Sequence, residues 1–315
     1  MKHAICLILM VLVTPISAQE NKTKELQDIS VTIRSNMAQG SGVLVTRKIG
    51  KDTVTFVWTA AHVVDDLRRT RTVVDGGINK TVVEFGDAGI VQEFKQDGRR
   101  VGETKLDCQV IRYSDAYYGE DLALLRVRRK NYLPETIGAN FYLGTVIPDV
   151  GTKVTHVGSL LGQFGANSFT TGVIAQTGRV LKLGREVIFD QTTAPAFPGS
   201  SGGGIFMEQN NLYIGMLVRG ADATFNFMVP VRRMQEWAKK SKVEWALDPS
   251  VPMPTEAELA KLPVEDAGAN MPSGDKASDK PCPANVEYPF LLIWKSAVSP
   301  DATDKPKSFL DILHK

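Results

Sequence analysis

The feature that most constrains the fold is a long succession of short apolar segments, which extends from about Ser30 to Val231. The segments are rich in β-branched residues and bounded by Gly, Asp, Asn or Pro, which is the pattern of β-strands joined by turns. The clearest are 42–45, 54–58, 81–85, 108–111, 122–127, 154–157 and 172–175. Because long helical periodicity is missing here, we expect an all-β body of about 200 residues, either two β-barrels or a sandwich.

One amphipathic helix is predicted directly after this body. Over Arg232–Lys242, the apolar residues Met234, Trp237 and Ala238 recur three and four residues apart, which places them on one face of a helix. We therefore expect a C-terminal helix to close the body.

The composition is that of a packed globular protein. Of the 315 residues, 43% are hydrophobic and 23% are charged, which excludes a mostly disordered or collagen-like chain. Lys and Arg number 37 against 35 Asp and Glu, so the net charge is +2. A nucleic-acid-binding protein usually carries a large basic excess, so we expect no nucleic-acid partner.

The first 18 residues have the pattern of a secretory signal peptide. Lys2 and His3 precede an apolar run at 4–13, and the small residue Ala18 marks the expected cleavage site. The run is too short to span a bilayer comfortably, and an uncleaved N-terminal anchor is the alternative. No later segment holds 18 consecutive apolar residues, so we expect no membrane span after cleavage and an exported protein, secreted or periplasmic.

The composition changes after Leu247. Residues 248–283 hold seven prolines among many Ala, Asp, Glu and Ser residues, which is typical of a linker or an extended surface tail. The apolar run 288–294 is expected to dock on the body, because burial of such side chains stabilises by about 1.5–3 kcal/mol each. The expected organisation is a signal peptide at 1–18, a folded domain at 19–247 and a Pro-rich tail at 248–315.

Two cysteines remain after the predicted cleavage removes Cys6. A disulfide between Cys108 and Cys282 would join the body to the tail in an oxidising compartment. Disulfide geometry is too demanding for the sequence alone to establish this pairing, so free thiols are the alternative. The chain has no C-x-x-C motif, and we expect no metal or other cofactor.

Two polar residues lie where apolar strands begin or end. His62 follows the strand at 54–58 in the segment Thr-Ala-Ala-His, and Asp121 directly precedes the strand at 122–127. Taken singly, they have ordinary interpretations, a hydrogen-bonded structural His and a turn Asp. Glu120 is a competing carboxylate, but we expect the acid that abuts the apolar strand to point inward, where it would orient an imidazole.

A serine in a glycine-rich loop is a candidate nucleophile beside this His and Asp. Ser201 lies in the segment 197–204, Phe-Pro-Gly-Ser-Ser-Gly-Gly-Gly, in which glycines let the backbone turn tightly and present N–H groups at one point. Such donors can stabilise a developing oxyanion. A flexible Gly-Ser loop is the alternative for this motif alone. A serine hydroxyl is a weak nucleophile that needs a base, and the base needs an orienting acid, so His62, Asp121 and Ser201 together predict nucleophilic catalysis.

The same loop also satisfies the pattern G-x-S-x-G, which is the nucleophile elbow of α/β-hydrolases. That fold needs alternating strands and helices, and an acid and then a His after the serine. The only later His is His314. An α/β-hydrolase-type esterase is therefore a remote alternative.

The order His62, Asp121, Ser201 is that of the chymotrypsin triad, and the surrounding segments resemble the trypsin/chymotrypsin-like serine proteases. The cysteine-poor body resembles the bacterial trypsin-like and HtrA-type members, without the PDZ domain of the latter. The resemblance covers about residues 30–242. It implies two six-stranded β-barrels with the active site between them, and a serine endopeptidase acting on a protein or peptide substrate.

By the same resemblance, Ser201 is the nucleophile, His62 the general base and then acid, and Asp121 the residue that holds the imidazole. The backbone N–H groups of Gly199 and Ser201 would form the oxyanion hole. Ser200 stands where digestive members carry an Asp that pairs with a freshly cut N-terminus, so activation by that route is not expected.

The resemblance also assigns a substrate pocket. Its walls would include Pro195, Val218, Arg219 and Gly220, with no acid at the floor, so we expect a small or medium apolar side chain rather than Lys or Arg. The alternative function on the same fold is an inactive or weakly active module that only holds a peptide. The sequence predicts no particular oligomeric state.

Overall fold

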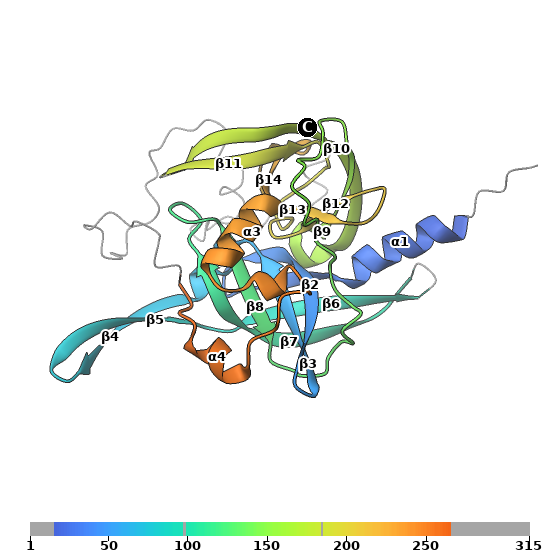
Figure 1. Cartoon of the computed structure of the whole chain (residues 1–315). Coiled ribbons are helices and arrows are strands. Elements are labelled where there is room, and N and C mark those ends of the chain that lie inside the picture. The colour runs from blue at the N-terminus through green and yellow to red at the C-terminus, as the bar shows by residue number, and fades with distance from the viewer. Residues whose placement is uncertain (1–15, 97–98, 184, 266–315) are drawn as a thin grey trace, which may run out of the picture.

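The computed structural model describes residues 16–96, 99–183 and 185–265, with side chains from Lys22 onward (Figure 1). In these parts of the chain, twelve strands form two closed six-stranded barrels, and two more form a separate ribbon. This arrangement confirms the all-β prediction with two barrels, and it excludes both a sandwich and the alternating α/β order of an α/β-hydrolase.

The first barrel is made by the N-terminal half of the chain, and all its strand pairs are antiparallel. Around the barrel the strands are β1 (Ser30–Arg34), β2 (Gln39–Ile49), β3 (Asp52–Thr59), β8 (Leu122–Val127), β7 (Arg99–Ser114) and β6 (Ala88–Gln96). Strand β3 is almost wholly buried from Val54 to Thr59, because its alternating sides face the barrel interior and the rest of the protein.

The second barrel follows and is also antiparallel. Around it the strands are β9 (Lys153–Leu160), β10 (Gly165–Leu183), β11 (Arg185–Thr192), β14 (Phe225–Pro230), β13 (Tyr213–Asp222) and β12 (Gly204–Met207). Closed barrels leave no free strand edges, so the backbone groups of both barrels are paired within each sheet.

A two-stranded ribbon projects from the first barrel, where Figure 1 shows it extending away from the body. It consists of β4 (Arg68–Asp75) and β5 (Ile78–Phe85), which pair only with each other. The segment 81–85 is therefore a strand, as predicted, but it belongs to the ribbon. Its β-branched residues indicate a strand, but they do not indicate which sheet the strand joins.

The predicted C-terminal helix is α3 (Val231–Lys240), which begins directly after Pro230 and lies against the barrels (Figure 1). The Trp237 ring packs edge-on against Trp58 of β3, with the ring centroids 5.8 Å apart. Trp58 also donates a hydrogen bond to the carbonyl of Ala246, at 3.1 Å. The end of the second barrel is thus fixed to the first.

The remaining helical segments are short, apart from the N-terminal helix. They are α1 (Ile16–Asp28), α2 (Ala61–Val64), η1 (Asp65–Leu67), η2 (Gly162–Phe164), η3 (Glu244–Ala246) and α4 (Glu256–Lys261). The predicted cleavage site after Ala18 lies within α1. No helix in the described ranges is long and apolar enough to cross a membrane.

The first part of the Pro-rich tail lies on the first barrel. Thr255 caps α4 through a capping box with Glu258, and the carbonyl of Val264 accepts a hydrogen bond from the Tyr113 N–H, at 2.8 Å. Val251 also packs against the core. The tail residues 288–294 and Cys282 lie outside the described residues, so their docking and pairing stay predictions.

Candidate active site

The glycine-rich loop between β11 and β12 has a shape that only glycine permits. Gly199 and Gly202 have φ angles of +94° and +89°, which L-residues rarely adopt. A Cβ atom on Gly199 would overlap the carbonyl oxygen of Ser159, and one on Gly202 would overlap that of Ser41. The loop is therefore held tightly against both barrels, with Ser201 between the two glycines.

Ser201 is largely buried, with 7% of its surface exposed. Its Oγ donates a hydrogen bond to the carbonyl of Val218, at 3.3 Å. Among the hydrogen bonds of the described residues, none joins Ser201 to His62. Hydrogen bonds of catalytic groups are often long or misaligned without substrate and tighten in the complex, so this geometry is compatible with a nucleophile.

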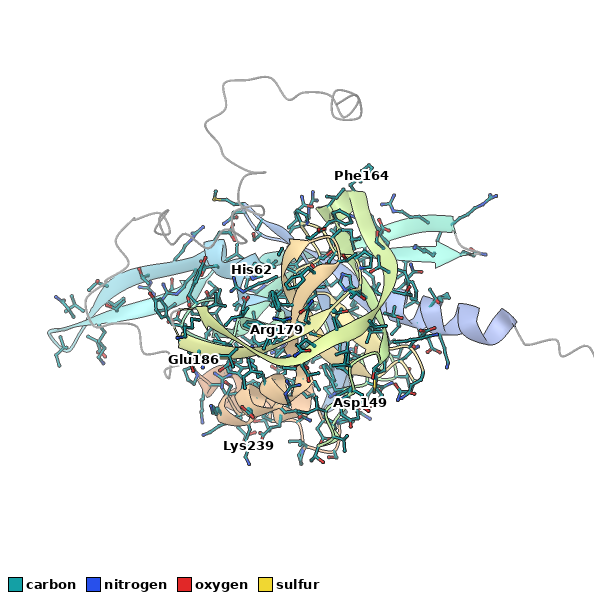
Figure 2. The ribbon with its side chains drawn as sticks, turned by 90° about the horizontal axis from the view of Figure 1, so that it is seen from above. His62, Asp149, Phe164, Arg179, Glu186 and Lys239 are labelled. Atoms are coloured by element: carbon teal, nitrogen blue, oxygen red, sulfur yellow. The ribbon has the colours of Figure 1, made fainter. Side chains whose placement is uncertain are left out.

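His62 is presented by the short helix α2, directly after β3. The other three residues of this turn are buried, and the imidazole is the side chain that reaches partly into solvent, with 35% exposure. In Figure 2, His62 lies toward the middle of the molecule, with the β4–β5 ribbon projecting on one side and α1 on the other. The end of a rigid barrel strand thus positions this side chain at the junction of the barrels.

The structure brings His62 and Asp121 into direct contact. Nδ1 of His62 lies 3.0 Å from each carboxylate oxygen of Asp121, and the His62 backbone N–H donates to Oδ1 at 3.1 Å. Because Nδ1 faces the carboxylate, its proton resides on that side and Nε2 remains available as a base. The carboxylate therefore fixes both the orientation and the tautomer of the ring.

Asp121 is buried and adopts a left-handed backbone conformation, with a φ angle of +57°. Asp tolerates this region better than most residues, and the Asp121 N–H donates to the carbonyl of Asp115, at 3.1 Å. Burial alone would raise the pKa of Asp121, but His62 and Arg219 outweigh it and hold this pKa below its usual range. The carboxylate is thus negatively charged where it meets the imidazole.

Glu120, the competing carboxylate, faces a different set of groups. It forms an ion pair with Arg233, 2.7 Å from Nη2, and a second one with Arg185. Arg233 extends from α3, and its guanidinium also lies over the ring of Phe189, 4.8 Å from the centroid. This network joins the Asp121 loop of the first barrel to β11 and α3 of the second.

The backbone N–H groups of Gly199 and Ser201 donate to no acceptor in the part of the chain that the structure describes. The carbonyl of Pro198, by contrast, accepts a hydrogen bond from Leu161 at 2.6 Å. The two ends of a trans peptide point in opposite directions, so this bond turns the Gly199 N–H away from Leu161. Two unpaired donors beside a serine hydroxyl are what an oxyanion hole requires.

The four predicted pocket residues lie on both sides of the serine loop. Pro195 is half-buried and its carbonyl accepts from Thr170. Val218 and Arg219 lie on β13, followed by Gly220, which pairs with Asn226 of β14. The Arg219 guanidinium extends to the first barrel, where it donates to the Ala116 carbonyl at 3.0 Å and to Asp121 at 3.4 Å.

Cys108 is buried in the first barrel and is a free thiol among the described residues. Burial raises the pKa of this thiol well above its usual range. The residue is therefore an unreactive part of the core in this state. Because Cys282 lies outside the described residues, the predicted disulfide is not tested.

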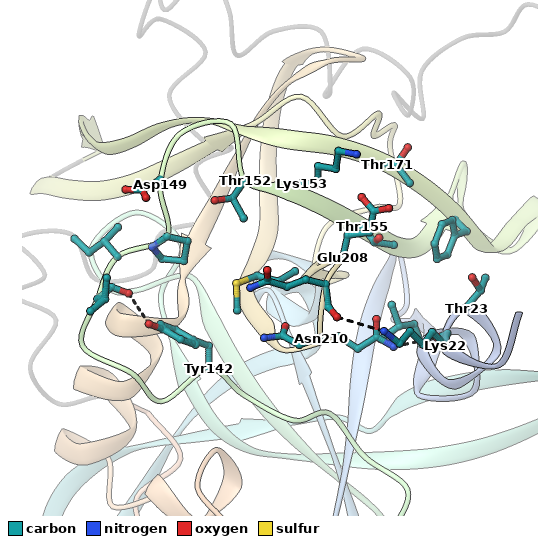
Figure 3. Close-up of a pocket in the computed structure, with 18 residues that line it drawn as sticks. Lys22, Thr23, Tyr142, Asp149, Thr152, Lys153, Thr155, Thr171, Glu208 and Asn210 are labelled. Atoms are coloured by element: carbon teal, nitrogen blue, oxygen red, sulfur yellow. Dashed lines mark hydrogen bonds between the residues drawn. The ribbon is translucent and has the colours of Figure 1, made fainter. Parts of the chain in front are cut away.

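A groove of the described surface lies away from these residues. It has a volume of about 960 Å³ and is bordered by α1, the segment 142–155 and the turn 207–211. Figure 3 shows Tyr142 at one side, where its hydroxyl donates to the Val146 carbonyl at 2.8 Å, and Lys22 at the other. None of the predicted site residues lines this groove.

Comparisons with known proteins identify the family of the chain. A family model for the trypsin-like peptidase domain matches residues 40–216, which is more than half of the chain. The chain belongs to the trypsin-like peptidase family. This membership confirms the resemblance stated from the sequence. No significant match is found among curated proteins.

Comparison with solved structures finds a similar fold in Deg5. The crystal structure of Deg5 has a TM-score of 0.51 at 17% identity, over 75% of this chain and 99% of that one. The serine endoprotease from Yersinia pestis has a TM-score of 0.49 at 18% identity, over 72% of this chain and 66% of the other. This chain thus spans just under two thirds of the Yersinia chain.

Two contacts of the site have no local signal in the sequence. Arg219 approaches Asp121 from 98 residues away, and Ser41 donates to the Gly199 carbonyl from 158 residues away. Neither residue type nor spacing indicates such a contact. The sequence could have suggested only that Arg219 lies near the rim of the pocket.

Proposed function

We propose that the protein is a serine endopeptidase that hydrolyses peptide bonds through an acyl-enzyme. The observation that carries the proposal is the contact of the buried Asp121 carboxylate with Nδ1 of His62, 3.0 Å from both oxygens. This pairing has a specific chemical use, since it leaves Nε2 free to take a proton. The membership of the trypsin-like peptidase family supports a peptide as the substrate.

In the proposed reaction, Ser201 Oγ turns from the Val218 carbonyl toward His62 and attacks the carbonyl carbon of the scissile bond. Nε2 of His62 takes the hydroxyl proton, and the carbonyl oxygen becomes an oxyanion that the N–H groups of Gly199 and Ser201 stabilise. The imidazolium then gives its proton to the leaving amine, and the C–N bond breaks. A water molecule, deprotonated by His62, hydrolyses the remaining ester and regenerates Ser201.

A fluorophosphonate probe, which reacts with activated serines, tests the chemistry directly. We expect the mature chain to be labelled and Ser201→Ala to abolish labelling and lower kcat by about 10⁴- to 10⁶-fold. Ser200→Ala is the matched control, since the Ser200 hydroxyl accepts a hydrogen bond from the Phe197 N–H and lies in the same turn. Labelling that depended on Ser200 and not on Ser201 would overturn the assignment.

The second candidate function is an inactive module that only binds peptides. The observation that favours it is that no hydrogen bond joins Ser201 to His62 among the described residues. A folded wild-type chain that bound peptides but neither reacted with the probe nor cleaved a mixed peptide library would support this alternative.

Cleavage of the library also tests the substrate pocket. We propose a preference for small or medium apolar residues, because Pro195, Val218 and Gly220 offer no carboxylate for Lys or Arg.

We propose that the chain is exported, on the basis of the apolar run at 4–13 and the small residue at Ala18. The test is the N-terminal sequence of the protein recovered from expressing cells. A mature chain that begins at Gln19 outside the cytoplasm supports export, and an intact Met1 terminus in the cytoplasm contradicts it.

A further inference from the structure

Ser41 of β2 is the most heavily bonded residue around the serine loop, and it is fully buried. Its Oγ donates to the Gly199 carbonyl at 2.7 Å and accepts from the Ser159 N–H at 2.7 Å. Its own N–H donates to the Ser201 carbonyl at 2.7 Å, and its carbonyl accepts from the Thr59 hydroxyl at 2.7 Å. Ser41 therefore connects three strands with the two residues whose N–H groups are the proposed oxyanion donors.

The direction of the hydroxyl proton follows from its neighbours. A backbone N–H can only donate, so the Ser41 oxygen accepts the bond from Ser159 and its single proton is available for Gly199. The carbonyl of Gly199 can only accept, which matches that proton. Ser41 and Ser159 are buried, and both of these bonds together satisfy the hydroxyl in one orientation.

Gly199 requires such a constraint because glycine rotates easily about both of its backbone bonds. Two peptide planes meet at this residue. The Pro198–Gly199 plane carries the N–H of the proposed oxyanion hole and is held by the Leu161 N–H, 2.6 Å from the Pro198 oxygen. The Gly199–Ser200 plane is held at its oxygen by the Ser41 hydroxyl. At its nitrogen, the Ser200 N–H donates to the Phe197 carbonyl at 2.9 Å, which is a bond within the serine loop itself. The Ser41 hydroxyl therefore bonds the carbonyl of this plane to strand β2 of the first barrel. Without it, the plane would be bonded only within the loop, and the Gly199 backbone could shift together with the loop.

We propose that Ser41 is a positioning residue for peptide hydrolysis, whose hydroxyl keeps the Gly199 N–H directed at the developing oxyanion. The role rests on the proposed function, because it concerns a donor used by the acyl-transfer reaction. Ser41 does not touch the substrate in this scheme. It acts through Gly199.

The first test is Ser41→Ala in the full chain. We expect kcat to fall by about 10- to 100-fold with KM changed by less than about threefold, since loss of a direct oxyanion donor lowers kcat by about 100- to 1000-fold and Ser41 acts indirectly. Active enzyme is counted by fluorophosphonate labelling, so a smaller folded fraction does not imitate the effect. A purely structural role would lower the labelled fraction and leave kcat per labelled molecule unchanged.

A second readout isolates the oxyanion itself. A peptide aldehyde adds to the serine Oγ, and its carbonyl oxygen then occupies the oxyanion position. We expect Ser41→Ala to weaken aldehyde inhibition by the same factor as kcat, whereas the affinity for the corresponding peptide acid stays within about twofold. The comparison separates loss of oxyanion stabilisation from loss of substrate binding.

Thr32→Val is the matched control. The buried Thr32 hydroxyl lies 2.6 Å from the hydroxyl of Ser159, the residue whose N–H bonds to Ser41. Removal of the Thr32 hydroxyl therefore disturbs the packing of β1 against β9 without removing a bond to Gly199. We expect a lower melting temperature, with kcat and aldehyde affinity within about twofold of wild type. If Ser41→Ala does not fold, Ser41→Cys retains a weaker donor of similar size, and we expect a several-fold loss of kcat.

The proposal is overturned if Ser41→Ala, or Ser41→Cys where that variant replaces it, keeps the wild-type kcat and aldehyde affinity. An equal loss of kcat in Thr32→Val also overturns it, because the loss would then come from disturbed packing between the barrels and not from Gly199. Both outcomes require an active wild type. A wild-type chain that neither labels nor cleaves peptides refutes the proposed function instead, and the two failures are thus distinguishable.

Discussion

Arg219 donates to the same oxygen of Asp121 that contacts the imidazole of His62. The distance from Nη2 of Arg219 to Oδ2 of Asp121 is 3.4 Å, and Nδ1 of His62 lies 3.0 Å from that oxygen. Because the Arg219 side chain is only 13% exposed, solvent screens this charge weakly. The guanidinium therefore competes with the imidazole for the negative charge of Asp121.

Removal of this competing charge is expected to move the pH profile of the reaction. In Arg219→Met, Asp121 would stabilise the protonated imidazole more strongly, so a higher pH would be needed to obtain the neutral base. We expect the midpoint of the acidic limb of kcat/KM to rise by about 0.3–1 pH unit. The measurement is kcat/KM from pH 5 to 9 at constant ionic strength.

Arg185→Met is the control for Arg219→Met, because Arg185 contacts Glu120 and the Gly119 carbonyl rather than Asp121. Its profile should keep the wild-type midpoint. A downward shift in Arg219→Met, or equal shifts in both variants, would show that Arg219 does not act on the Asp121–His62 pair.

Gly199→Ala is expected to abolish most activity for a steric reason. The added Cβ would overlap the Ser159 carbonyl at a φ angle of +94°, so the loop must move and the Gly199 N–H moves with it. We expect kcat to fall by at least about 100-fold, as for the loss of an oxyanion donor.

Gly151→Ala separates steric overlap from backbone strain. Gly151 has a φ angle of +89°, but a Cβ there meets no atom within 4 Å. We therefore expect a loss of about 1 kcal/mol in unfolding free energy and unchanged kcat. Comparable kcat values for the two alanine variants would contradict the steric explanation.

The sequence indicates candidate site residues through local patterns, but it does not indicate the contacts that these residues make. The Gly-flanked Ser201 and the strand-adjacent His62 and Asp121 are local patterns, because the chemistry needs particular residue types beside particular backbone shapes. Ser41 and Arg219 have no such pattern, since their contacts form only when β2 and β13 close against the loops of the other barrel. The same holds for the fold. β-Branched residues predict strands such as 81–85, but contacts distant in the sequence decide which sheet each strand joins.

The ion pair between Arg233 and Glu120 is expected to hold the two barrels together. Both side chains are mostly buried, with 9% of Arg233 and 17% of Glu120 exposed. In Arg233→Met, Glu120 keeps only Arg185 as a cationic partner among the described residues. We expect a loss of about 2–4 kcal/mol in unfolding free energy, because one partner of a buried pair is removed.

A double-mutant cycle with Glu120→Gln measures the coupling in this pair. We expect the double variant to be more stable than the sum of the single losses implies, with a coupling of about 1–3 kcal/mol. Strictly additive losses in urea unfolding would show that the contact contributes nothing beyond the packing of each side chain.

His156 on β9 is expected to make the stability depend on pH. It is fully buried beneath the serine loop; Nδ1 lies 3.1 Å from the Gly204 carbonyl and Nε2 has no described partner. Burial lowers the pKa of His156 from 6.5 to about 4, opposed only by that hydrogen bond. Between these values the unfolded chain binds a proton that the folded protein excludes, so stability falls as the pH falls.

The size of this effect is set by the two pKa values. From pH 7 to pH 5, we expect His156 to remove about 2 kcal/mol of unfolding free energy. His156→Asn retains a donor for the Gly204 carbonyl but cannot bind the proton, so its stability should fall less over the same range. Urea unfolding of both proteins at pH 7 and pH 5 measures the difference, in which the carboxylates common to both cancel. Parallel losses in the two proteins would mean that His156 is neutral in the unfolded chain as well, or accommodates its proton in the fold, and either result would refute the prediction.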